Sequence, residues 1–192
     1  MKKNQTIINR VEQYEYKRGI TYIKSSGKFF GALKIFFSVF FVWAFIMNFL
    51  TVLSWSLKIG TELFKSVSNT FYTLLFFTAL SLLGYIFSLT KLKLIGIFIS
   101  IFSSIFTVIV YAPLLKDATT TLGYKTIFFT RHLIPHTAIV IVSLMMLLVL
   151  VISYFKFTNL YKKIEKTLYE EYKTKKETEN IDITWEEYLD TI

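Results

Sequence analysis

The sequence contains no cysteine, only two prolines, and no charged residue in the middle of any of its long apolar runs. The absence of cysteine excludes disulfide bonds, thiolate chemistry and cysteine-bound metal. Proton relays and ion pathways in membrane proteins usually include an ionisable residue within a span. The missing mid-span charges therefore disfavour an ion-coupled pump or transporter.

Four uncharged runs of 22 to 25 residues dominate what the sequence does contain. A helix rises about 1.5 Å per residue, so each run is long enough to cross a hydrocarbon layer roughly 30 Å thick. None has the regular polar stripe of an amphipathic helix in a soluble protein. The sequence therefore predicts an all-α integral membrane protein, a four-helix transmembrane bundle. The predicted spans are 35–57, 68–90, 94–115 and 133–155.

The transmembrane domain, residues 35–155, lies between a basic arm, residues 1–34, and a charged tail, residues 156–192. Four spans place both termini on one side of the membrane, and that side carries 17 of the 22 Lys and Arg residues. The positive-inside rule then predicts a multi-pass plasma-membrane protein with cytoplasmic N- and C-termini. The net charge of +9 reflects this topology, and no nucleic-acid partner is expected.

The arm and the tail both show helical periodicity. Ile7, Val11 and Tyr14 recur at helical spacing, which fits an amphipathic interfacial helix, with a flexible basic anchor as the alternative. In the tail, apolar residues four apart predict a helix that continues the last span and stops near 179–180. These residues are Leu160, Ile164, Leu168 and Tyr172.

The end of the tail, "ITWEEYL", predicts a second, short helix. Thr184 and Glu187 have the spacing of a capping box, in which each side chain bonds the backbone of the other residue. Trp185, Tyr188 and Leu189 then form an apolar knob. The knob either docks on the chain's own arm or binds a protein partner.

Several polar residues are expected to meet near the outer leaflet, because successive spans run in opposite directions. They are Asn48, Asn69, Tyr111, Arg131, His132 and His136. The positive end of the last helix, with Arg131 beside it, favours binding of a lipid headgroup or another anion. Arg and His side chains also belong naturally in the headgroup layer without any ligand. A metal site that adds Glu62 and Asp117 to the histidines is the less favoured alternative, so no metal and no cofactor are predicted.

Three segments carry a resemblance to a known family: "FKSVSNTFYTLLFF" (64–77), "TVIVYAPLL" (107–115) and "RHLIP" (131–135). Together they resemble the bacterial branch of the androgen-induced membrane hydrolase family. That family has six helices, and its animal members cleave fatty-acid esters with an intramembrane threonine and a histidine. The resemblance implies that His132 is the family's histidine. Lys65 occupies the threonine's position.

Under this resemblance Ser66, Ser68 or Thr70 would stand in as the nucleophile, with His132 or His136 as the base. An integral membrane hydrolase for lipid-like esters at the outer leaflet is therefore the second functional hypothesis. It requires a Ser or Thr hydroxyl within about 3.2 Å of a His nitrogen. The first hypothesis is a non-enzymatic accessory, immunity-like, lipid-sensing or partner-binding membrane protein. The lack of the family threonine and of mid-span charge favours the first.

Overall fold

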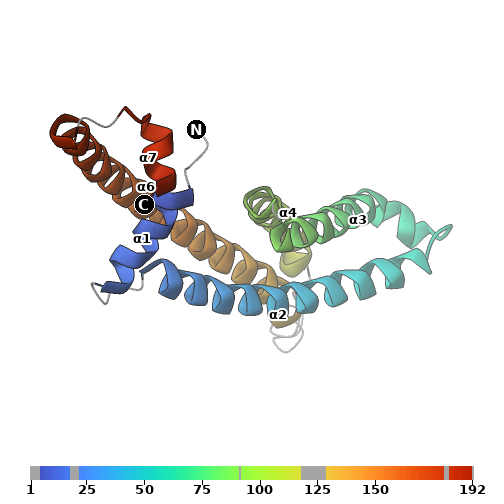
Figure 1. Cartoon of the computed structure of the whole chain (residues 1–192). Coiled ribbons are helices and arrows are strands. Elements are labelled where there is room, and N and C mark those ends of the chain that lie inside the picture. Colours follow the sequence, from blue (N-terminus) through green and yellow to red (C-terminus); the bar gives the residue numbers. More distant parts are fainter. Residues whose placement is uncertain (1–4, 18–21, 91, 118–128, 180–181, 192) are drawn as a thin grey trace. The chain divides into compact units, whose positions relative to one another are not determined.

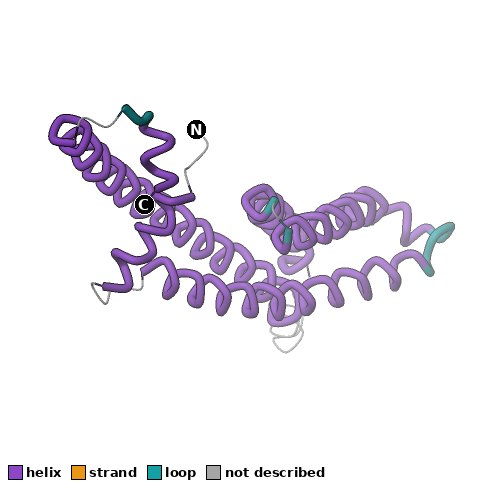
Figure 2. Tube along the Cα trace, in the orientation of Figure 1, coloured by secondary structure: helices purple, strands orange, loops and turns teal. Residues whose placement is uncertain are grey.

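The computed structural model describes residues 5–17, 22–90, 92–117, 129–179 and 182–191. Within these ranges the chain is helical and has no strand (Figure 2). The elements, labelled in Figure 1 where there is room, are α1 (Gln5–Lys17), α2 (Tyr22–Ser56), α3 (Glu62–Leu89), α4 (Lys93–Asp117), the π-helical turn η1 (Phe129–Leu133), α6 (Ile134–Glu179) and α7 (Trp185–Thr191).

Four of the described helices, α2, α3, α4 and α6, are long and apolar enough to cross a membrane. This confirms the prediction of a helical chain with four candidate spans. Large apolar side chains along these helices, among them Phe36, Phe76 and Leu148, are more than half exposed. Exposed side chains of this size suit contact with lipid, where helices satisfy their own backbone hydrogen bonds. The chain thus has the structure of a multi-pass membrane protein.

The chain forms two compact units. The membrane unit is Phe30–Leu148, and the terminal unit combines Met1–Phe29 with Val149–Ile192. The terminal unit therefore joins segments from the two ends of the sequence. Each unit is described by itself below.

Within the membrane unit, α3 and α4 approach each other closely, as Figure 1 shows. A Cβ added at Gly96 of α4 would lie 2.7 Å from the carbonyl oxygen of Gly84 and would collide with the backbone nitrogen of Ser88, both in α3. Small residues permit this approach because no side chain separates the two backbones. Small residues of α3 and α4, among them Gly84 and Gly96, therefore meet at this contact.

Most buried hydroxyl groups of α3 and α4 are satisfied within their own helices. Each donates to a carbonyl oxygen three or four residues earlier. These residues are Thr78, Ser81, Ser88, Ser100, Ser103 and Thr107. This internal bonding removes the cost of placing a free hydroxyl in an apolar environment.

An aromatic contact connects α2 with α3. Phe41 of α2 stacks on Tyr85 of α3, with ring centroids 4.1 Å apart.

In the terminal unit, α1 packs against the charged part of α6 and against α7. Ile7 and Val11 of α1 are 1% and 0% exposed. They share one apolar cluster with Tyr161, Leu168 and Leu189. The arm is thus helical from Gln5 to Lys17, and the chain's own tail covers its apolar stripe.

The expected end of the tail helix and the expected cap of the last helix are both confirmed. Helix α6 ends at Glu179. Before α7, the backbone N–H of Thr184 donates to Glu187 Oε2 at 2.8 Å, and the backbone N–H of Glu187 donates to Thr184 Oγ1 at 3.3 Å. The bond from the Thr184 N–H, together with one that the Thr184 hydroxyl donates to Glu187 Oε2 at 2.8 Å, lowers the pKa of the Glu187 carboxyl below its ordinary value.

Candidate functional site

The two histidines lie where α6 begins. His132 belongs to the π-helical turn η1, and His136 lies in the first turn of α6, which starts at Ile134. Pro135 is accommodated there because the first turn of a helix does not need its backbone N–H. The predicted start of this helix, near residue 133 or 134, is therefore confirmed.

A polar cluster forms around Asn48 in the membrane unit. Asn48 Oδ1 accepts a hydrogen bond from the Tyr111 hydroxyl at 2.9 Å and lies 3.2 Å from His136 Nε2. The three residues come from α2, α4 and α6, and none is more than 1% exposed. The bonds connect three helices through one amide oxygen. The polar cluster is defined here as Asn48, Tyr111, His132 and His136.

His132 joins the polar cluster through its ring. The centroids of the His132 and Tyr111 rings are 4.7 Å apart, with an interplanar angle of 40°. Apolar side chains surround Tyr111: Leu74 and Leu133 are buried with it, and Val52, Trp55 and Val108 pack against them. The cluster therefore lies in an environment of low polarity, where each hydrogen bond is strong and an unmade one is costly.

The contact with Asn48 favours one tautomer of His136. Because an amide oxygen only accepts hydrogen bonds, a bond to Asn48 Oδ1 requires the hydrogen on Nε2, and Nδ1 of the neutral ring then keeps its lone pair. His136 Nδ1 and Asn48 Nδ2 are buried and make no hydrogen bond to the described residues. One acceptor and one donor therefore remain unused on the two central side chains of the cluster.

The other residues that the sequence analysis placed near the outer leaflet, or considered as nucleophiles, are in more open positions where the structure describes them. Arg131, next to His132, is exposed, and so is Asn69 on α3. Ser68 is partly exposed, and its hydroxyl donates to the backbone carbonyl of Lys65 at 3.2 Å. Ser66 belongs to α3, but its side chain is outside the described part of the chain.

The knob at the end of the tail is covered by the chain itself. Tyr188 and Leu189 are 4% and 2% exposed, and Trp185 packs at the edge of the cluster formed by α1 and α6. Trp185 also lies edge-on to Tyr172, with ring centroids 5.6 Å apart. The structure thus has the self-docked arrangement, one of the two expected for these side chains.

No group of three or more His, Asp or Glu residues that could hold a metal ion occurs among the described residues. Glu62, considered above as a ligand, instead forms an exposed ion pair with Lys65 at 2.6 Å.

Two buried hydroxyls were not singled out from the sequence. Ser104 of α4 and Ser143 of α6 are 1% and 0% exposed, and neither hydroxyl oxygen has a hydrogen-bond partner among the described residues. A serine in an apolar run, next to Ser103 in one case and isolated in the other, is the signal that the sequence offers for these positions. That signal does not tell whether the serine faces lipid or a neighbouring helix.

No family model, no curated protein and no solved structure matches the chain, so the resemblance to the hydrolase family stays a prediction.

Proposed function

We propose that the chain is a non-enzymatic plasma-membrane protein that senses anionic lipid at the end of a transmembrane bundle where its histidines lie. One observation carries the proposal: His136 Nε2 lies 3.2 Å from Asn48 Oδ1. A hydrolase needs a histidine nitrogen beside a Ser or Thr hydroxyl. An amide oxygen holds the buried histidine instead, and an amide is not a nucleophile of this kind.

The candidate nucleophile Ser68 gives further support. Its hydroxyl donates to the carbonyl of Lys65 within its own helix. The buried hydroxyls of Thr78 and Thr107 bond in the same way, to Leu74 and Ser103. A hydroxyl that donates to a backbone carbonyl does not present its proton to a base.

The lipid-sensing role is supported by what surrounds the start of α6. The helical run begins with η1 at Phe129, and the unpaired N–H groups of such a first turn carry partial positive charge. Exposed Arg131 adds a full positive charge within that turn. Together these charges suit a phosphate headgroup at the membrane surface.

An accessory role through the tail is less well supported. A protein partner that docks on Trp185, Tyr188 and Leu189 would have to displace the chain's own α1 and α6 from the same cluster.

The packing of α1 with α6 and α7 also supports the proposal that both termini lie on the cytoplasmic side of the membrane. Helix α1 follows the N-terminus and α7 precedes the C-terminus, and both belong to the terminal unit. An even number of spans brings the termini together in this way.

The purified chain is expected to show no labelling by a serine-hydrolase probe in detergent, because no hydroxyl in the proposal is activated. Labelling is read by in-gel fluorescence, with a known serine hydrolase as the positive control. Labelling of the wild type that disappears in both His132→Ala and His136→Ala would instead establish the membrane hydrolase. The same preparation should retain anionic lipid in native mass spectrometry.

Retention of that lipid depends on Arg131 in this proposal. Replacing Arg131 by Gln removes one charge near the headgroup layer, a change of roughly 1 kcal/mol, so retention should weaken about fivefold. Lys58→Gln is the matched control, since Lys58 is also exposed and is expected on the same side of the membrane. Equal loss in both variants would contradict a site at Arg131.

The proposed topology can be mapped cleanly because the natural sequence has no cysteine. A membrane-impermeant maleimide is expected to label Lys58→Cys in intact cells, and Glu177→Cys only after the cells are opened. Both positions are exposed. The positive-inside distribution of Lys and Arg is the physical reason for this outcome. Labelling of Glu177→Cys in intact cells would reverse the proposed orientation.

A further inference from the structure

Two lysines from different helices of the membrane unit meet at one aromatic ring. Lys34 Nζ of α2 lies 5.6 Å from the centroid of the Phe30 ring, one turn earlier on the same helix. Lys93 Nζ, at the first residue of α4, lies 5.6 Å from the same centroid. The two ammonium groups are therefore separated by no more than twice that distance. These three residues are called the Phe30 site below.

The membrane unit supplies no carboxylate to balance the two positive charges of the Phe30 site. Neither lysine forms an ion pair with another described residue. The only acidic residues between positions 30 and 148 are Glu62 and Asp117, which follow the spans that Lys34 and Lys93 precede. A span separates its two ends by roughly 30 Å of hydrocarbon. The aromatic ring attracts both cations but does not neutralise them.

Both lysines lie at the boundary of an apolar run. Lys34 comes directly before the uncharged residues 35–57, and Lys93 comes directly before the uncharged residues 94–115. A lysine at the end of a span extends its ammonium group into the headgroup layer. Lys93 is exposed, and Lys34 and Phe30 are partly exposed. The Phe30 site is therefore accessible at the depth where the phosphate groups of a bilayer lie.

An anion held between the two lysines would remove a cost of this arrangement. Two like charges near one ring repel each other, and the repulsion is stronger beside hydrocarbon than in water. Basic sites between transmembrane helices bind phosphate headgroups. A lysine ammonium is a compact charge that can approach a phosphate oxygen from many directions. A phosphate without a cationic group attached to it suits the site best, because it carries a net negative charge.

We infer that the Phe30 site binds the phosphate headgroup of an anionic phospholipid in the adjoining leaflet, which is the cytoplasmic leaflet in the proposed topology. A lipid bound here contacts both α2 and α4 and stabilises these helix ends against separation. The site lies at the other end of these spans from the polar cluster. It does not depend on the function proposed for that cluster.

The test uses the full chain in neutral detergent, titrated with phosphatidylglycerol or phosphatidylcholine and followed by native mass spectrometry. Lys34→Gln and Lys93→Gln should each weaken phosphatidylglycerol retention about fivefold, with little change for phosphatidylcholine. The same losses are expected when Arg131→Gln is also present, so lipid bound at the start of α6 does not determine the result.

Lys156→Gln is the matched control. Lys156 is an exposed lysine that comes directly after the uncharged run of α6, so it lies at a comparable depth on the same predicted side of the membrane. This variant should leave retention within about twofold of wild type. Equal weakening by Lys156→Gln and Lys93→Gln would show diffuse surface attraction and would overturn the site.

Two further outcomes decide the inference. Lys93→Arg keeps the charge and should retain the lipid, whereas a loss as large as that in Lys93→Gln would contradict a site that depends on charge. Inorganic phosphate at the same concentration should not displace the lipid, because the acyl chains also hold the lipid at the site. Displacement by inorganic phosphate would identify a site for free phosphate and overturn the inference.

Discussion

Gly96→Ala is expected to be the most damaging single methyl addition in the membrane unit. The new Cβ would collide with the backbone nitrogen of Ser88 and lie 2.6 Å from the carbonyl carbon of Phe87. Backbone atoms cannot swing aside, so α3 and α4 would have to separate along their contact. Overpacking a well-packed site costs about 1–3 kcal/mol, and backbone obstruction places this variant at or above the top of that range.

Gly31→Ala is the control for this experiment. Gly31 also lies in the membrane unit, on α2, and a Cβ there meets nothing within 4 Å. Alanine favours helix over glycine by about 1 kcal/mol at most, so Gly31→Ala should be neutral or slightly stabilising. Both variants can be compared by unfolding in mixed detergent micelles. Equal stability of the two would show that α3 and α4 are not in close backbone contact.

The second large effect is expected for Asn48→Leu. Leucine has the same branching at Cγ but accepts no hydrogen bond, so the Tyr111 hydroxyl and His136 Nε2 would both lose their bond to Asn48 Oδ1. His136 Nε2 would then be an unsatisfied buried group, which costs about 1–3 kcal/mol, and the lost Tyr111 bond adds to this cost although the Tyr111 hydroxyl keeps a hydrogen bond with Thr51. We therefore expect the free energy of unfolding to fall by about 3 kcal/mol, measured in the same micelles. Asn69→Leu, at an exposed asparagine of α3, should change it by less than about 1 kcal/mol.

A double-mutant cycle gives a sharper test of the Asn48 bond. Tyr111→Phe removes only the hydroxyl that donates to Asn48. Once Asn48 has been replaced by leucine, removing that hydroxyl should cost less than it does in the wild type, because its partner is already absent. Strict additivity of Tyr111→Phe and Asn48→Leu would contradict a hydrogen bond between these residues.

The spans could be predicted from the sequence because a lipid-facing helix must be apolar on its exposed sides, and long uncharged runs are visible without an alignment. The convergence of Asn48, Tyr111 and His136 was also predictable, since alternating helix directions bring them to one end. Their bonding pattern was not, because it depends on the rotation of each helix about its axis. The same rotation leaves Asn69 exposed on α3.

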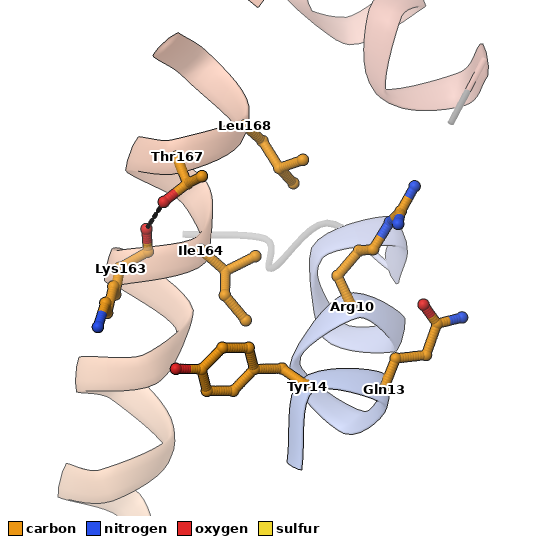
Figure 3. Close-up of a pocket in the computed structure, with 7 residues that line it drawn as sticks. All are labelled: Arg10, Gln13, Tyr14, Lys163, Ile164, Thr167 and Leu168. Atoms are coloured by element: carbon orange, nitrogen blue, oxygen red, sulfur yellow. Dashed lines mark hydrogen bonds between the residues drawn. The ribbon is translucent and has the colours of Figure 1, made fainter. Parts of the chain in front are cut away.

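The terminal unit was harder to predict. The periodicity of Ile7 and Val11 indicated an apolar stripe on the arm, and "ITWEEYL" indicated a capped helix with an apolar knob. Periodicity shows which face is apolar, but it does not identify what covers that face. A groove between α1 and α6, whose lining includes Tyr14 and Ile164 (Figure 3), exists only once α1 has packed on α6, so no local pattern in either segment indicates it.

The pairing of the first helix with the last two also constrains how the protein is made. Val11 leaves the ribosome about 150 residues before Tyr161, one of the side chains that share its apolar cluster. At typical synthesis rates this delay is on the order of ten seconds. During that time the apolar stripe on α1 has no partner within its own chain. Either a chaperone or the membrane surface must then cover this stripe and keep it from water. Translation must therefore be almost complete before the terminal unit can assemble.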